Sequence, residues 1–388
     1  MCRRNPPRMI QRERMVESLL DLVKIDSQSK EELPVAQRLM SDLQAIGADV
    51  RIDDAGSKVG GNSGNVIARF AGTKPDAPPL LLSAHMDTVP PGRGVKPVRM
   101  SDRIKTDGTT VLGGDDKSGV AVILEVLRAL KENAVPHGDI EVAFSICEEI
   151  GLLGAKNLDV AALRAREAIV LDATHASFCF TQAPSADHFE FTVHGLEAHA
   201  GLAPETGISA VRVAAEAIAA MPLGRIDALT TSNIVIVSGG AATNVVPNEC
   251  VVRGEARSLD DATLDKTTAA IRLCFQEAAA RATATVDGKV QRAWIEERSG
   301  RDYESMHVPD SDPLVRGLLA AAAAAGTAVT TASIGGGCDA NVFNRRGIRA
   351  VNFGTGMRDI HTVNEWLDLA DFYTCADVVL EFVRARAS

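Results

Sequence analysis

The sequence lacks any apolar run near the ~20 residues that a membrane-spanning helix requires. The nearest candidate, LLAAAAAAG at Leu318–Gly326, is much shorter. The first residues, MCRRNPPRMIQRERM, are basic but have no apolar centre of the kind found in secretory signals. We therefore expect neither a membrane span nor a secretory signal.

Paired cysteines and an excess of positive charge are also absent. The seven cysteines are dispersed, with no CxxC motif and no paired spacing. Such a set is typical of free thiols in a reducing compartment, so we expect a cytoplasmic protein. The net charge is −10, from 41 Lys and Arg against 51 Asp and Glu. This balance argues against nucleic acids and anionic membranes as partners.

The length of 388 residues favours two domains. Segments of β-strand character alternate with helical periodicity from residue 11 to about 183 and again after Tyr303, which predicts an α/β fold with parallel strands. The expected helices are 11–25, 35–46, 115–135, an alanine-rich helix near 318–326 and a C-terminal helix from Glu365. The expected strands are 48–54, 65–72, 79–85, 139–149, 167–173, 328–334 and 349–356.

The pattern changes between these two regions. His188–Gly195 alternates apolar and polar residues, as a half-exposed antiparallel strand does. A helix at 208–220, strands at 231–240 and 248–258, a helix at 261–282 and a last strand near 283–290 follow. This βαββαβ order is typical of a ferredoxin-like unit. We predict a discontinuous main domain, residues 1–184 and 300–388, with an inserted α+β domain at 185–299.

Histidine and carboxylate residues follow the ends of the predicted strands. Ligands in open α/β sheets lie beyond the carboxyl ends of the strands, so these side chains should meet there. Two histidines with several carboxylates suit a hydrolytic metal centre, and their number fits two metals better than one. The residues are His85, Asp115 with Asp116, Glu148 with Glu149, Asp172 and His361.

Each of these residues also has a structural explanation when taken alone. Asp115 by itself would more often cap a helix than bind a metal, and Glu148 with Glu149 could form a solvated turn. The combination favours the metal interpretation, because two adjacent buried glutamates repel one another unless a cation lies near.

Six ordered segments carry a resemblance to a known family. They are SAHMDTVPPG, GTTVLGGDDKSGVA, EEIGLLGAK, VHGLEAHAGLAPETGISA, TNVVPN and GTGMRDIHTVNEW. Together they resemble the co-catalytic dizinc exopeptidases, which include peptidase T, carboxypeptidase G and succinyl-diaminopimelate desuccinylase. LGGDDKSG and the terminal GTGM followed by HTVNE are most similar to the peptidase T-like branch. The fold implied is a zinc-exopeptidase-like mixed sheet with an inserted lid and dimerisation domain.

The resemblance implies roles for the strand-end residues. His85 and His361 would each bind one metal, with Asp115 bridging both through a carboxylate that precedes a cis peptide bond. Glu149 would complete one site and Asp172 the other. Glu148 would be the general base that deprotonates a metal-bridging water and then protonates the leaving amine, and Asp87 would orient the imidazole of His85. Zinc is the default metal, with Co²⁺ or Mn²⁺ as alternatives.

In the inserted domain, the resemblance implies that His199 polarises the scissile carbonyl, often from a partner subunit. Asn244 and Arg257 match positions that hold the substrate backbone or carboxylate, and Arg suits a carboxylate because its planar donors bind both oxygens. The alternatives are a loop histidine and a surface strand residue.

The glycine-rich turn GGGCDAN at Gly335–Asn341 makes Asp339 a candidate substrate contact, with a helix cap as the alternative. The turn could also cradle a phosphate, but no Lys-Ser/Thr pair follows it. Cys338 and Ala173 depart from the residues more usual in the family, which leaves the substrate open.

The expected activity is hydrolysis of an amide bond in a short peptide, with removal of the first residue of a tripeptide. A homodimer formed through the lid domain is expected. An N-acyl amino acid amidohydrolase or carboxypeptidase would use the same residues, and a non-catalytic metal- or peptide-binding protein would not need Glu148. A phosphate-binding transferase would depend on GGGCDAN instead.

Overall fold

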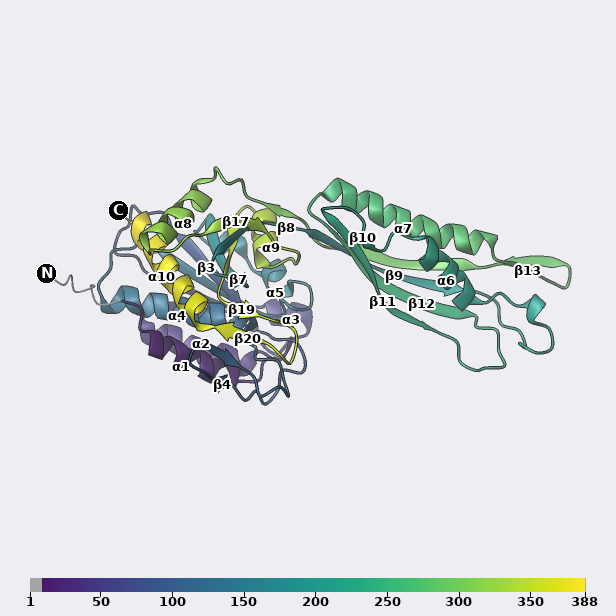
Figure 1. The fold of residues 1–388 in the computed structure, drawn as a ribbon, viewed down its shortest axis with the longest axis horizontal. Coiled ribbons are helices and arrows are strands. Elements are labelled where there is room, and N and C mark those ends of the chain that lie inside the picture. Colours follow the sequence, from purple (N-terminus) through teal and green to yellow (C-terminus); the bar gives the residue numbers. More distant parts are fainter. Residues whose placement is uncertain (1–8, 388) are drawn as a thin grey trace. The chain divides into compact units, whose positions relative to one another are not determined.

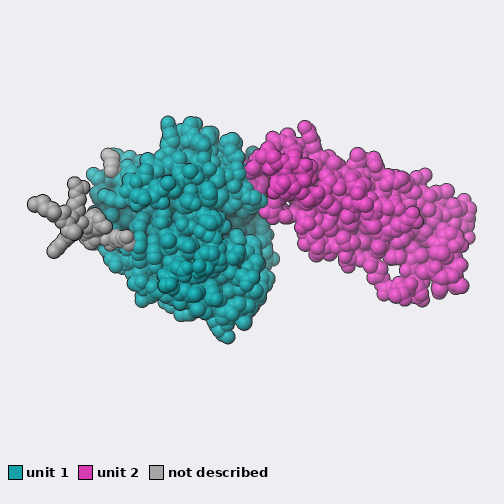
Figure 2. All heavy atoms as spheres, viewed as in Figure 1, with its two compact units in different colours: residues 1–183, 306–388 teal, residues 184–305 magenta. Residues whose placement is uncertain are grey.

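The computed structural model of the protein describes residues 9–387, so Cys2 and the start of the basic N-terminal segment lie outside the described residues. Two compact units, coloured in Figure 2, comprise residues 1–183 with 306–388 (unit 1) and residues 184–305 (unit 2). The sequence analysis ended the inserted domain at 299. Strand β15 (Trp294–Tyr303) instead pairs with β9 (Ser185–His194) as far as Tyr303, so unit 2 ends later.

Unit 1 contains a nine-stranded mixed sheet, and the predicted α/β sheet flanked by helices is confirmed (Figure 1). Its four central strands run parallel. All residues of β3 are buried, which explains its unbroken apolar run. Across the sheet the strands are β1 (Asp49–Ile52), β2 (Val66–Phe70), β6 (Ile140–Ser145), β3 (Leu80–His85), β7 (Glu167–Ala173), β18 (Arg349–Gly354), β8 (Phe178–Ala183) and β16 (Met306–His307), with β17 (Thr330–Ser333) also beside β8.

The helices of unit 1 bury apolar residues that recur at helical spacing. In α1 these include Met15, Leu19 and Leu22. Helix α4 packs against β3, and α1, α2 and α10 pack against α4. The helices are α1 (Arg12–Val23), α2 (Leu33–Ile46), α3 (Ala55–Val59), α4 (Gly114–Glu132), α5 (Leu153–Asn157), α8 (Pro313–Ala324), α9 (Asp339–Arg345) and α10 (Leu369–Arg386), with a 3-10 turn at Val160–Ala162.

The C-terminal helix begins later than predicted. The Asp368 carboxylate accepts the N–H of Asp371 and caps α10, so the helix starts at Leu369 and not at Glu365. The preceding residues form β20 (Trp366–Asp368), which joins β19 (Met357–Arg358), β5 (Arg103–Lys105) and β4 (Val98–Arg99) in a small separate sheet. This arrangement leaves Glu365 outside any helix.

Unit 2 follows the βαββαβ order and has a five-stranded antiparallel sheet. Phe189, Phe191 and Val193 of β9 form its core with the two helices, and Phe191 stacks on Phe275 with ring centroids 4.2 Å apart. Its elements are β9, a 3-10 turn (Pro204–Thr206), α6 (Ala210–Ala220), β10 (Gly224–Arg225), β11 (Thr230–Gly239), β12 (Glu249–Ser258), α7 (Asp261–Arg281), β13 (Thr283–Val286), β14 (Lys289–Arg292) and β15.

The prediction of a last sheet strand near 283–290 was wrong. Residues 283–292 form a separate hairpin of β13 and β14, and β15 is the strand that completes the sheet. Asp287 and Gly288 join the hairpin with φ of 50° and 73°. Asp-Gly favours such a tight turn because both positions require positive φ.

None of the helices within residues 9–387 combines the length and apolar character needed to cross a membrane.

Candidate metal centre

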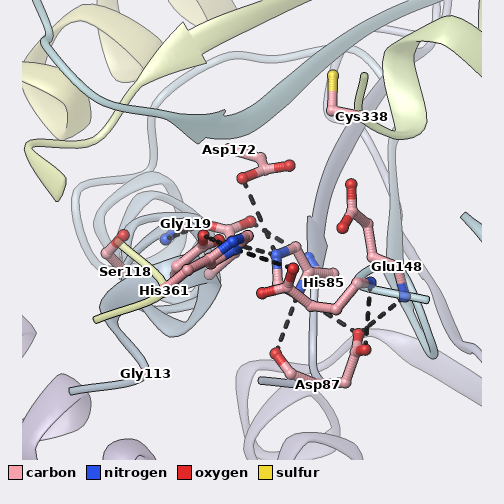
Figure 3. A network of polar contacts seen from close by, with 12 residues as sticks. His85, Asp87, Gly113, Ser118, Gly119, Glu148, Asp172, Cys338 and His361 are labelled. Carbon is pink, nitrogen blue, oxygen red and sulfur yellow. Dashed lines mark hydrogen bonds and ion pairs between the residues drawn. The ribbon is translucent and has the colours of Figure 1, made fainter. Parts of the chain in front are cut away.

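Five predicted metal ligands of unit 1 lie close together, three of them on or just after parallel strands (His85, Asp172 and His361 are labelled in Figure 3). His85 is the last residue of β3 and Asp172 lies near the end of β7, whereas Glu149 lies in the turn that follows β6. Asp115 lies at the start of α4, where its backbone angles are not yet helical and its peptide bond to Asp116 is cis. His361 lies between β19 and β20.

The Asp115 carboxylate lies between the two imidazoles. Its Oδ1 is 2.9 Å from Nε2 of His85, and its Oδ2 is 3.2 Å from Nε2 of His361. Glu149 Oε2 is 3.0 Å from the same His361 nitrogen, and Asp172 Oδ1 is 3.9 Å from Nε2 of His85. The arrangement therefore divides into a His85 side with Asp172 and a His361 side with Glu149, joined by Asp115.

Asp116, which the sequence analysis named beside Asp115 without assigning it a ligand role, also lies in this cluster. Ligand atoms of His85, Asp116 and Asp172 lie within 4.8 Å of one another, as do those of His85, Asp115 and Glu149. The two Asp116 oxygens accept the backbone N–H groups of His85 and Gly119, at 3.2 and 3.1 Å. These bonds give Asp116 a structural role at the start of α4.

The donor set fits divalent cations. Burial, together with the nearby Asp115 charge, raises the pKa of both Asp172 and Glu149. Burial would also raise the pKa of Asp115, but hydrogen bonds with His361 and His85 hold it below its ordinary value. The buried Oε1 of Glu149 has no hydrogen-bond partner in the described chain. Imidazole nitrogens and several carboxylate oxygens are ligands that Zn²⁺, Co²⁺ and Mn²⁺ accept, and a cation would relieve this crowding.

Asp87 contacts the His85 imidazole, as the sequence analysis expected, and it also accepts hydrogen bonds from other residues. The His85 Nδ1 lies 3.0 Å from the backbone oxygen of Asp87 and 3.4 Å from its Oδ1. The same carboxylate accepts the N–H groups of Glu148 and Glu149, at 2.9 and 3.3 Å, and the hydroxyl of Ser29 at 2.6 Å. Asp87 thus links the imidazole to the turn that carries both glutamates.

Glu148 is buried in the cluster, but its carboxylate makes no hydrogen bond within the described residues (Figure 3). Burial raises its pKa well above the ordinary value, and although His85 opposes this shift, the charges of Asp172 and Glu149 reinforce it. A carboxylate with increased proton affinity and no fixed partner is suited to accept and return a proton.

Two positioning residues escaped the sequence analysis. The buried Glu365 carboxylate accepts the N–H groups of Leu112, Gly113 and Asp115, at 2.7, 2.9 and 3.0 Å. Asn352 accepts the N–H of Asp172 at 3.0 Å and donates to its backbone oxygen at 2.6 Å. Glu365 ends the quoted segment HTVNE, which was a usable signal, whereas no local pattern marks Asn352.

Asp339 is the first residue of α9 and is buried in unit 1. Ser145 Oγ donates to its Oδ2 at 2.5 Å, and its Oδ1 has no partner in the described chain. Burial raises the pKa of Asp339 to about 6.

The remaining predicted residues lie in unit 2. His199 and Val245 form a β-bridge, and the N–H of Ala200 donates to the backbone oxygen of Asn244 at 2.9 Å, so the segments of His199 and Asn244 lie side by side. Arg257 lies on β12 and pairs with Glu255, with Nη2 and Oε2 2.9 Å apart.

The fold and the cluster at the sheet edge are those of a metal-dependent peptidase. Residues 81–385 match the peptidase family M20/M25/M40, and the chain belongs to this family. The resemblance drawn from the six segments is therefore confirmed.

Three similar proteins cover almost the whole chain. Uncharacterized protein YqjE of Bacillus subtilis (strain 168) is 37% identical over 98% of this chain and 100% of its own length. Aminopeptidase PepT from Bacillus cereus ATCC 10987, known from a crystal structure, is 36% identical in sequence to this chain. The two structures match with a TM-score of 0.87 over 98% of this chain and 100% of the PepT chain. A tripeptidase (SAV1512) from Staphylococcus aureus subsp. aureus mu50 is 34% identical, with a TM-score of 0.90 and the same coverage.

Proposed function

We propose that the protein is a metal-dependent aminopeptidase that removes the first residue of tripeptides. The observation that carries the proposal is the Asp115 carboxylate shared between His85 and His361, with the buried Glu148 carboxylate in the same cluster. The similarity to an aminopeptidase and a tripeptidase over 98% of the chain supports the substrate class.

Two divalent cations, most simply Zn²⁺, would be held by His85, Asp172 and Asp115 on one side and by His361, Glu149 and Asp115 on the other. When bound, they supply Lewis acidity toward the peptide carbonyl and lower the pKa of water in the site. The carboxylate of Asp115 would keep both sites in register, because each of its oxygens already faces a different imidazole.

Glu148 would take the proton of the attacking water and then deliver it to the leaving amine. Because the carboxylate makes no hydrogen bond within the described residues, it can serve both steps. General acid–base catalysis of this kind contributes ~10²–10⁴-fold to a rate. His199 would stabilise the developing negative charge on the carbonyl oxygen. Asn244, Arg257 and Asp339 are the proposed contacts to the peptide, with Arg257 binding its carboxylate.

The first prediction is that the metal-loaded protein prefers a free amino terminus. A panel of tripeptides, their N-acetylated forms and N-acyl amino acids, followed by mass spectrometry, should show loss of the first residue from the free tripeptides only. We expect a preference of ~10² or more, because a site that pairs polar groups with a substrate rejects analogues that leave them unpaired. Cleavage of the blocked substrates would assign the protein to the amidohydrolase or carboxypeptidase alternative, and cleavage of none would refute the proposal.

A homodimer through unit 2 is part of the proposal. Strand β11 pairs with β10 only at Thr231 and Ser232, so its later residues form an open edge within the described sheet. Val235, Ile236 and Val237 on this edge are 65%, 41% and 53% exposed. An exposed apolar edge strand is a ready surface for pairing with a second copy.

The second prediction tests this edge. The V235K/V237K double variant should raise the dimer dissociation constant by ~10-fold or more, because a symmetric interface brings introduced like charges together. Sedimentation across a concentration series measures the change. V290K is the matched control, since Val290 is 61% exposed on the β14 strand of the same unit. A monomeric wild type, or an unchanged dimer in the double variant, would exclude this interface.

We also propose a cytoplasmic location for the protein. All six described cysteines are free thiols, as expected in a reducing compartment. Recovery of the native protein from a secreted fraction would contradict it.

A further inference from the structure

The turn that presents Glu148 is held by side chains from distant parts of the chain. It covers residues 146–149, directly after β6, and each of its four successive N–H groups donates to a side-chain oxygen. The acceptors lie between 61 and 115 positions away along the sequence. In order they are Asn65 Oδ1 at 3.1 Å, Glu32 Oε1 at 3.0 Å, Asp87 Oδ1 at 2.9 Å and Asp87 Oδ2 at 3.3 Å.

The turn needs this support because Cys147 has a φ of 51°. Residues other than glycine disfavour the left-handed region, since their Cβ crowds the backbone there. Glu32 contacts Cys147 twice, because its Oε1 accepts both the backbone N–H at 3.0 Å and the thiol at 3.3 Å. The direction in which the Glu148 side chain leaves the turn follows from the conformation of this preceding residue.

Burial at this position removes the Glu32 carboxylate from water. The residue is fully buried, and its Oε2 has no hydrogen-bond partner in the described chain. Burial and the nearby Asp87 charge raise its pKa. Although Glu32 precedes α2, its side chain does not cap that helix. Its Oε1 accepts the N–H of Lys30 at 3.0 Å besides the two hydrogen bonds from Cys147.

We propose that Glu32 is a positioning residue for Glu148. It holds Cys147 in the left-handed conformation and so fixes the direction of the Glu148 carboxylate, while Asp87 holds the amide of Glu148 itself. This inference rests on the proposed function, in which Glu148 moves the proton. It adds a group that contacts neither metal nor substrate.

The third prediction concerns E32A and E32Q in the full-length, metal-loaded protein. E32A should lower kcat by ~10-fold or more with little change in KM, because small misplacements of a catalytic group are costly. Both variants should keep the wild-type metal content. E32Q retains an acceptor oxygen and should recover most of the lost rate. L39A, which truncates a fully buried residue of the adjoining helix α2, is the control for lost stability and should lower Tm without the loss in kcat.

Two further measurements separate positioning from a general structural role. In an E148Q background, E32A should cause little additional loss, since the group that it positions is already gone. Hydrogen exchange of the peptide 146–152 should be faster in E32A and near wild type in E32Q, a readout that does not depend on activity.

The failures are distinguishable. If the wild type hydrolyses no peptide, the proposed function fails, and the exchange measurement still tests the support of the turn. If the wild type is active and E32A stays within twofold of its kcat, or loses rate only in proportion to Tm as L39A does, Glu32 has no positioning role.

Discussion

Replacing Glu148 by glutamine is expected to lower kcat by ~10²–10⁴-fold while leaving the metal content of the protein unchanged. The amide keeps the size of the side chain but cannot accept and return a proton. The substitution removes no hydrogen bond within the described residues, where the carboxylate makes none. Metal analysis of the purified variant and steady-state kinetics on a tripeptide measure the two effects.

The adjacent residue is a matched control for this experiment. Glu149 lies in the same turn, but its Oε2 is 3.0 Å from Nε2 of His361, so E149Q should lower the metal content first and the rate as a consequence. Added metal should restore part of the rate of E149Q and none of that of E148Q. Loss of metal in E148Q would contradict the proposed division between base and ligand.

The sequence predicted the central sheet because segments of β-strand character, several of them largely apolar, alternate with helical periodicity and end in polar residues. The run PLLLSAH became β3, buried throughout and ending at His85. The order of parallel strands then accounts for the meeting of His85, Glu149 and Asp172, although they are far apart in sequence. Topology therefore made these ligands predictable without coordinates.

Other features depend on contacts that no local pattern records. Glu365 accepts the backbone N–H of Asp115, which lies 250 positions away in the sequence. Glu32 accepts the backbone N–H of Cys147, which lies 115 positions away. HTVNE marks the segment of Glu365 but not its backbone partners, and no local pattern marks Glu32, so only the fold brings the two carboxylates to their donors. The β13–β14 hairpin is different, because Asp287 and Gly288 are a turn signal that the sequence analysis overlooked.

Asp115→Ala is expected to reduce bound metal from two cations to less than one per chain and to lower kcat/KM by ~10³-fold or more, since Lewis-acid stabilisation is worth several kcal/mol. The reason is geometric. Asp115 is the group whose two oxygens face both His85 and His361, at 2.9 and 3.2 Å. D172A removes a ligand from the His85 side alone, and E149A removes one from the His361 side alone. Each variant should therefore retain about one cation per chain.

Thermal unfolding gives a readout of the same assignment without turnover. Adding metal should raise the Tm of the wild type, because a ligand that binds only the folded state stabilises it, and should leave D115A nearly unchanged. Two cations bound to D115A would refute the bridging role. Retention of one cation would show that Asp115 serves only one of the two metal sites. The ligand to test at the second site would then be Asp116, because it lies within reach of His85 and Asp172.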